Sequence, residues 1–140
     1  MKRTNSAGGI VISSLGKILV VTNEIGSITF PKGSQKAGEQ PIDTARREIT
    51  EESGLTEFEI HKELGVLIRP GYTAENSHTP SVTKHIHMFL CTTRQEKLSP
   101  VADDVLSAEW VNLSEVPDIL SRKEETEFFV LHLKEIELLI

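Results

Sequence analysis

Three glutamates at helical spacing are the residues of this sequence best suited to do chemistry. Glu48, Glu51 and Glu52 stand at positions i, i+3 and i+4, so they share one face of an α-helix that turns by about 100° per residue. An apolar stripe lies about a quarter turn away and consists of Ile42, Ala45 and Ile49. Such a helix can pack on a sheet while it presents three carboxylates along one edge.

Carboxylates in this arrangement repel one another, and a bound cation would remove that cost. Like charges four residues apart destabilise a helix by roughly 0.2–0.5 kcal/mol per pair, and the helix dipole disfavours negative charge in the C-terminal half. Hard cations that prefer oxygen ligands, Mg²⁺ first and Mn²⁺ second, would turn the repulsion into coordination. A solvated acidic face is the other interpretation of the same spacing.

The residues before the helix favour the cation site over a solvated face. A loop is expected over residues 31–38, and it carries two lysines and two glycines: Lys32, Gly33, Lys36 and Gly38. A loop of this kind can bring backbone groups and positive charge close to a phosphate. Glu39 and Arg47 are both placed where they can support the acidic cluster.

The remaining elements predict how this helix is held. Pro41 suits a first helical turn and Gly54 a C-terminal stop, so the helix is expected over about residues 40–53. A second helix over about 122–138 would bury Phe128, Leu131, Ile136 and Leu139. Apolar and alternating runs predict strands over about 7–14, 17–22, 27–30, 56–68, 84–93 and 106–112. Mixed strands with two helices indicate an α/β layered fold, and the length fits a single domain over residues 1–140.

The segment 69–83 has no clear periodicity. A loop of that length inside a compact domain is usually functional, so we expect substrate contacts there.

Composition limits the classes of partner. The formal net charge of −6 argues against non-specific binding to nucleic acids or anionic membranes, and no apolar stretch approaches the roughly 20 residues of a membrane span.

The single cysteine, Cys91, excludes an intrachain disulfide and follows an apolar run, so a packed strand thiol is expected. We expect a cytoplasmic protein, a monomer or a homodimer, without a stable nucleic-acid partner.

From Gly33 to Leu55 the sequence resembles the complete signature of the Nudix hydrolase family, Gly-x5-Glu-x7-Arg-Glu-U-x-Glu-Glu-x-Gly-U, where U is aliphatic. Every specified position is met, and both variable lengths are correct. The Phe-Pro-Lys-Gly segment from Phe30 and the Glu-Trp-Val segment from Glu109 are also similar to segments found in the family. The resemblance implies an α/β/α sandwich with a mixed β-sheet, and hydrolysis of a nucleoside diphosphate linked to another group X.

The resemblance also implies roles for individual residues. Three side chains and one backbone carbonyl would bind the metal: Glu48, Glu51, Glu52 and Gly33. One of the glutamates would also be the general base, and Arg47, paired with Glu39, would hold the carboxylates in place. Relatives often supply a further acid before the tryptophan strand; Asp104 is the first candidate and Asp103 the second. Both aspartates are equally explained as caps of a turn.

Substrate contacts are less well defined by the sequence. Lys32, Arg69 and Lys84 could hold phosphates, and Tyr72 or Phe30 could stack on a base. Glu75 is an alternative base, and surface solvation or core packing explains each of these residues equally well.

The sequence is compatible with three functions. The Phe-Pro-Lys-Gly segment is similar to that of diadenosine and diphosphoinositol polyphosphate hydrolases, which favours a dinucleoside polyphosphate substrate. A nucleoside triphosphate, ADP-ribose or a nucleotide sugar is the enzymatic alternative. A non-catalytic nucleotide sensor is the alternative of another class, although the acidic cluster is intact.

Overall fold

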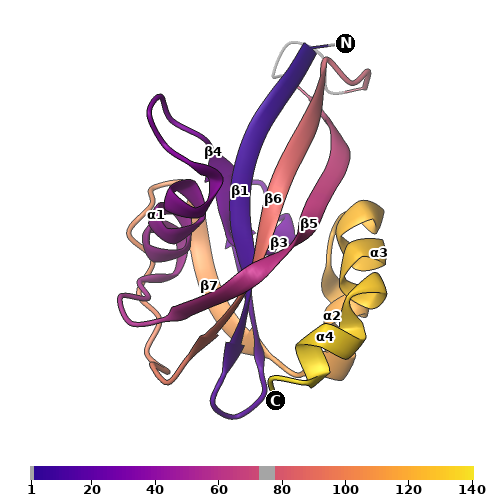
Figure 1. The fold of residues 1–140 in the computed structure, drawn as a ribbon. Coiled ribbons are helices and arrows are strands. Elements are labelled where there is room, and N and C mark those ends of the chain that lie inside the picture. The colour runs from indigo at the N-terminus through magenta and orange to yellow at the C-terminus, as the bar shows by residue number, and fades with distance from the viewer. Residues whose placement is uncertain (1, 73–77) are drawn as a thin grey trace.

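The computed structural model describes residues 2–72 and 78–140, which form a mixed sheet between two layers of helix (Figure 1). Seven strands make up the sheet: β1 (Lys2–Ser13), β2 (Ile18–Asn23), β3 (Ile28–Thr29), β4 (Lys32–Ser34), β5 (Glu59–Gly71), β6 (Val82–Thr93) and β7 (Val105–Val111). Helix α1 (Pro41–Ser53) covers one face. The other face carries a 3₁₀ turn (Leu113–Glu115) and the helices α2 (Val116–Ile119), α3 (Lys123–Leu131) and α4 (Leu133–Glu137).

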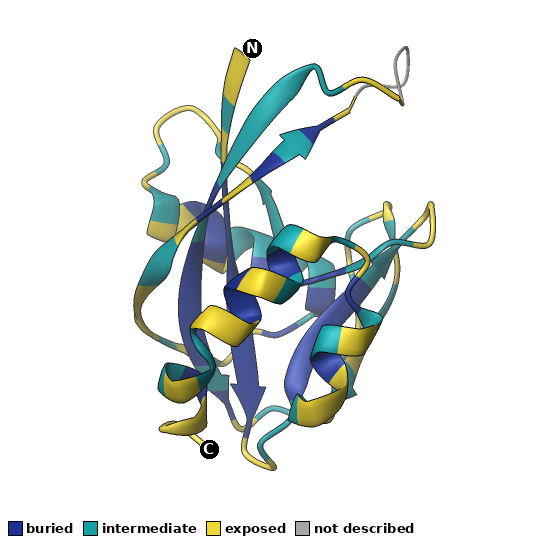
Figure 2. Ribbon diagram, turned by 90° about the vertical axis from the view of Figure 1, so that its right-hand side faces the viewer, coloured by how far each residue is buried: buried dark blue, intermediate teal, exposed yellow. Residues whose placement is uncertain are grey.

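The strand order β3-β2-β1-β6-β5 places β1 and β6 in the middle of the sheet. These two strands run parallel from Lys2 opposite Val82 to Ser13 opposite Thr93. The other pairings are antiparallel, including β4 on β1 and β7 on β2. Central strands covered on both faces are expected to be continuously apolar, and the lower parts of β1 and β6 are dark blue in Figure 2.

Two cores form because successive side chains of a strand point to opposite faces. Val11 and Cys91 belong to the core beneath α1, together with Ala45 and Ile49 of the helix. The larger core faces α2–α4 and contains, among others, Ile10, Ile12, Phe30, Ile86, Met88, Leu90, Phe128, Phe129 and Ile136. Burial raises the pKa of the Cys91 thiol to about 12, which agrees with the packed thiol expected from the sequence.

Helix α1 lies close against β1. A Cβ on Gly9 would come within 2.8 Å of Ile49 Cδ1, so the glycine permits this approach. The helix ends as expected at Gly54, whose φ of 80° is left-handed and whose N–H donates to Thr50 O at 2.8 Å. The predicted apolar stripe is wrong in one member, since Ile42 is 41% exposed.

Several strands extend beyond their predicted limits. Strand β1 starts at Lys2 because the whole of β6 is available to pair with it. The loop predicted over 31–38 contains β4, which pairs with β1. The aperiodic segment 69–83 contains the end of β5 and the start of β6. Pro70 is tolerated there because β5 is an edge strand, where a missing amide donor breaks no ladder.

The single C-terminal helix predicted over 122–138 is divided. Residue His132 ends α3 and precedes α4. Because of this break, the residues after His132 no longer continue the helical spacing of the residues before it. Phe128 and Ile136 are buried as predicted. Leu131 is 77% exposed, and Leu139 is only partly covered. Neither of these leucines is a core residue.

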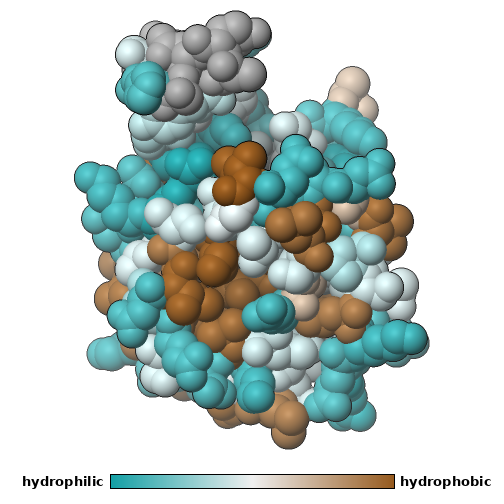
Figure 3. Space-filling view, turned by 180° about the vertical axis from the view of Figure 1, so that it is seen from behind, coloured by the Kyte–Doolittle hydropathy of each residue, from teal (hydrophilic) through white to brown (hydrophobic). Residues whose placement is uncertain are grey.

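The surface carries separate apolar patches. Figure 3 shows hydrophobic side chains gathered in the middle of the face opposite to that of Figure 1, bordered by hydrophilic ones. Apolar atoms normally contribute more than half of a protein surface. Among the described helices, none is long and apolar enough to cross a membrane.

The attachment of α1 can be tested by comparing two isoleucines of this helix. Ile49→Ala should lower the free energy of unfolding by about 2–5 kcal/mol, because it opens a cavity in a closed core. Ile42→Ala, on the exposed side of the same helix, should change it by no more than about 0.5 kcal/mol. Urea titrations measure both values, and equal losses would contradict the packing described here.

Candidate active site

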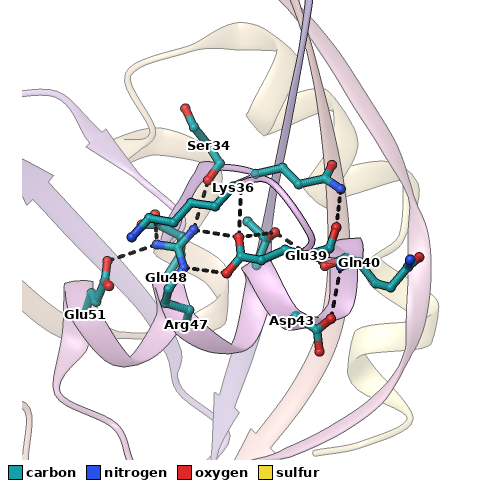
Figure 4. Close-up of polar contacts among 10 residues, drawn as sticks. Ser34, Lys36, Glu39, Gln40, Asp43, Arg47, Glu48 and Glu51 are labelled. Carbon is teal, nitrogen blue, oxygen red and sulfur yellow. Dashed lines mark hydrogen bonds and ion pairs between the residues drawn. The ribbon is translucent and has the colours of Figure 1, made fainter.

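Arg47 is the centre of a hydrogen-bond network on α1 (Figure 4). Its Nε donates to Glu39 Oε2 at 2.7 Å and its Nη2 to Glu39 Oε1 at 3.0 Å, a two-point contact with one carboxylate. Its Nη1 donates to Glu48 at 2.8 Å and to Glu51 at 3.2 Å. Nη2 also donates to the carbonyl of Ser34 at 3.0 Å. One guanidinium therefore joins β4, the loop that follows it and two glutamates of the acidic face.

Glu39 is held from several directions. Its Oε1 also accepts hydrogen bonds from Lys36 N at 2.8 Å and from Thr44 Oγ1 at 2.9 Å. The hydrogen bond from Arg47, with help from the Lys36 amide, lowers the pKa of Glu39 to about 2. The charged carboxylate is thus the form that fixes the loop to the start of α1.

Gly33 brings β4 into contact with the acidic face. A Cβ at this position would stand 2.1 Å from Glu48 Cδ, so the glycine lets β4 lie against that carboxylate without displacing it. Burial raises the pKa of Glu48, Arg47 counteracts the rise, and the neighbouring charges of Glu51 and Asp104 add to it.

Glu52 reaches the same strand. Its Oε1 accepts a hydrogen bond from Lys32 N at 3.0 Å. Burial nevertheless raises the pKa of Glu52 to about 7, and the charges of Glu48 and Asp104 contribute to the rise. Asp104 is exposed on the turn before β7, and its influence on both glutamates places it beside the acidic face. Asp103 has no such influence among the causes of these shifts.

The donor set fits a divalent cation. It consists of carboxylates that repel one another, and a hard cation that binds their oxygens would neutralise this negative charge. Within the described residues, however, no three acidic, histidine or cysteine side chains converge on one point as a preformed metal site. Arg47 holds Glu48 and Glu51, and the Lys32 amide holds Glu52, so the side chains would have to turn toward an ion.

The basic residues predicted as substrate contacts lie near one another. Arg69 is buried, while Lys32 and Lys84 are half-buried. Burial lowers the pKa of Lys84 to about 8, and the nearby charges of Arg69 and Lys32 lower it further. These three cations therefore form one group, as a phosphate site requires.

The structure places the two aromatic candidates for stacking on a base, Phe30 and Tyr72, in different environments. Phe30 is fully buried against Phe129, with ring centroids 5.9 Å apart, so the prediction that it stacks on a base is wrong. Tyr72 is 43% exposed at the end of β5. Glu75 lies outside the described residues.

Two further charged residues were not anticipated. Arg122 precedes α3, and Glu125 lies within it, fully buried. Both contribute to the pKa shifts of Lys32 and Lys84. A glutamate among other acidic residues at a helix start normally indicates a solvated turn, so the sequence holds no signal for its burial.

The family model of the NUDIX domain matches residues 2–131. The chain belongs to this family. The family resemblance and the assignment to the pyrophosphohydrolases are thereby confirmed, and Nudix hydrolases generally use divalent metal ions.

Solved structures of the family share the fold at low sequence identity. A MutT protein from Methanosarcina mazei Go1 is 15% identical, with a TM-score of 0.78 over 96% of this chain and 95% of that one. An Ap4A hydrolase from C. elegans, in a binary complex, is 19% identical, with a TM-score of 0.72 over 94% and 98% of the two chains. The NUDIX domain of Shewanella oneidensis NrtR, complexed with ADP ribose, is 12% identical, with a TM-score of 0.74 over 97% and 90%. These likenesses confirm the predicted Nudix fold with its mixed sheet.

The Arg47–Glu39 contact makes stability depend on pH in a defined direction. The pKa of Glu39 is lowered in the folded state, from 4.5 to about 2, so its contribution is present above pH 4.5 and is lost as the pH falls toward 2. The difference in melting temperature between the wild type and Glu39→Gln should therefore be largest above pH 4.5 and shrink below it.

The exposed Glu127 on α3 provides the control for loss of a carboxylate. Glu127→Gln should change the melting temperature much less than Glu39→Gln above pH 4.5. A Glu39→Gln difference that stays constant from pH 7 to pH 3 would show that the Arg47 contact does not act through the charged carboxylate.

Proposed function

We propose that this protein is a Mg²⁺-dependent pyrophosphohydrolase that cleaves a nucleoside diphosphate linked to a group X, with a dinucleoside polyphosphate as its main substrate. One observation carries the proposal: β4 separates three carboxylates of α1 from a group of cations. Lys32 belongs to both sides, because its amide binds Glu52 while its ammonium interacts with Arg69. A diphosphate over β4 would meet metal ligands on one side and positive charge on the other.

The metal would be held by side-chain oxygens and one carbonyl: Glu48, Glu51, Glu52 and Gly33 O, with Asp104 as a further acid. Mn²⁺ would substitute for Mg²⁺, since the donor set consists only of oxygen. A bound divalent cation neutralises charge on phosphate oxygens and lowers the pKa of a bound water.

The protein's own residues would carry the rest of the reaction. The oxygen of a water molecule adds to one phosphorus, the bond from that phosphorus to the bridging oxygen breaks, and the proton of the water passes to one of the three glutamates. Arg47 keeps Glu48 and Glu51 on the side of α1 that faces β4. Lys32 offsets negative charge on the diphosphate. The products are two fragments that each end in a phosphate.

The choice of dinucleoside polyphosphate rests on two supports. The Phe-Pro-Lys-Gly segment from Phe30 is similar to that of hydrolases of such compounds, and Lys32, Arg69 and Lys84 gather beside it. Tyr72 is the remaining exposed aromatic candidate for stacking on a base. Nucleoside triphosphates, ADP-ribose and nucleotide sugars are the competing substrates. The shared fold also occurs in a NUDIX domain complexed with ADP ribose and in a UDP-X diphosphatase.

A panel of nucleoside diphosphate derivatives with Mg²⁺, with products identified by mass in ¹⁸O-water, tests this function. The wild type should hydrolyse a dinucleoside tetraphosphate with the highest kcat/KM, and the label should locate the attacked phosphorus. Glu51→Gln and Glu52→Gln should each lower kcat/KM by about 100-fold or more, because each removes a charge that acts on the reacting phosphate.

Glu57→Gln is the matched control, because Glu57 is an exposed glutamate after α1 and should keep wild-type turnover. All variants should keep the wild-type circular dichroism spectrum. Retained turnover in both Glu51→Gln and Glu52→Gln would refute the assigned roles. Tight nucleotide binding without turnover across the panel would instead indicate a sensor.

A further inference from the structure

We propose that Arg122 and Glu125 complete, with Arg69 and Lys84, a subsite for a phosphate of X, and that this subsite makes the enzyme select substrates with phosphates beyond the cleaved diphosphate. The inference rests on the proposed function and adds two specificity-determining residues from the α2–α3 region.

Two of the cations lie directly opposite each other on neighbouring strands. Arg69 of β5 is paired in register with Lys84 of β6. Side chains alternate along a strand, so Arg69 shares a face with Leu67 and Lys84 shares one with Ile86, both of which belong to the core beneath α2–α4. Like charges in directly opposed positions destabilise a sheet. An anion between them would reverse that effect.

The helical layer supplies the other two residues on the same face. Glu125 accepts a backbone hydrogen bond from Phe30 and is influenced by Lys32, Arg69 and Arg122. Arg122 acts in turn on Arg69 and Lys84. Arg69 and Glu125 form a buried floor, and Lys32, Lys84 and Arg122 are half-buried around it. The three outer cations are therefore partly exposed to solvent.

This group of side chains, with Thr4 beside it, contains polar atoms that lack partners among the described residues. Four such buried atoms are Thr4 Oγ1, Arg69 Nε, Arg122 Nε and Glu125 Oε2. Thr4 lies opposite Lys84 in the parallel pairing of β1 with β6, so all four belong to one region. Buried polar atoms are normally hydrogen-bonded, and a cluster of unpaired ones indicates a place for a polar ligand.

The charges identify this ligand as an anion. Four cationic side chains surround Glu125, and Glu124 adds a second carboxylate near Arg69. Within the described part of the chain no ion pair joins any of the four cations to Glu125. Unpaired guanidinium N–H groups are donors that match phosphate oxygens. Glu125 offers an acceptor for a hydroxyl next to that phosphate and offsets part of the positive charge in the free protein.

The position of Lys32 shows which phosphate would bind. Its amide contacts Glu52 of the metal-binding face, and its ammonium interacts with Glu125 and Arg69. The subsite is thus separated from the carboxylates by one residue of β4. A phosphate held there would be adjacent to the diphosphate held at α1, as in a chain of three or more phosphates or in a phosphorylated X.

Binding of inorganic tripolyphosphate in EDTA tests the subsite apart from catalysis, because no metal is then present at α1. Isothermal titration should show binding to the wild type. Arg122→Met and Lys84→Met should each weaken it about tenfold or more, the loss expected for a charge-assisted contact. Arg94→Met is the matched control: Arg94 is exposed at the far end of the sheet and should bind like the wild type. Thermal melts identify any variant that is misfolded.

Kinetics give the second readout. The ratio of kcat/KM for a dinucleoside tetraphosphate to that for ADP-ribose should fall at least about tenfold in Arg122→Met, and Arg94→Met should keep the wild-type ratio. No binding to the wild type in EDTA, or equal binding by all variants, would overturn the subsite. If the binding results are as expected but the wild type hydrolyses no substrate, the proposed function fails and the phosphate subsite stands.

Discussion

The two-point contact between Arg47 and Glu39 is the interaction on which the geometry of the candidate site depends. Three carboxylates on one face of α1 would repel each other and the strand beside them. Arg47 places one positive charge among them and also binds Ser34 O, so β4 and the acidic face are fixed by a single side chain. Glu39 fixes Arg47 in turn, because a bidentate pair defines the plane of the guanidinium.

Strand β4 lies between the carboxylates of α1 and the group of cations. It is only three residues long, and it pairs with β1 at Ser6, Ala7 and Gly8. Gly8 is required there, since a Cβ would stand 2.1 Å from Pro31 O. On one side β4 meets Glu48 and Glu52, and on the other Lys32 joins the cations of β5 and β6. A fold that brings both charges to one short strand suits a substrate whose phosphates need cations along their whole length.

The sequence predicted the parts of this site that follow local rules. The helix over Pro41–Ser53, its stop at Gly54 and the placement of Glu39 and Arg47 beside the acidic face follow from spacing and capping alone. The length of β1, the strand β4 and the continuation of β5 through Pro70 could not be predicted, because they depend on partners distant in sequence. Glu125 was missed for the same reason: its burial results from the packing of α3 over the sheet, which its neighbours in the sequence do not reveal.

The acidic face of α1 is the proposed binding site of a divalent cation. Titration of the protein with Mn²⁺, followed by electron paramagnetic resonance, measures this directly. We predict saturable binding that Mg²⁺ displaces and that Glu48→Gln combined with Glu52→Gln abolishes while the protein stays folded. The claim would be contradicted by the absence of a saturable site in the wild type, or by a site that the double substitution leaves unchanged.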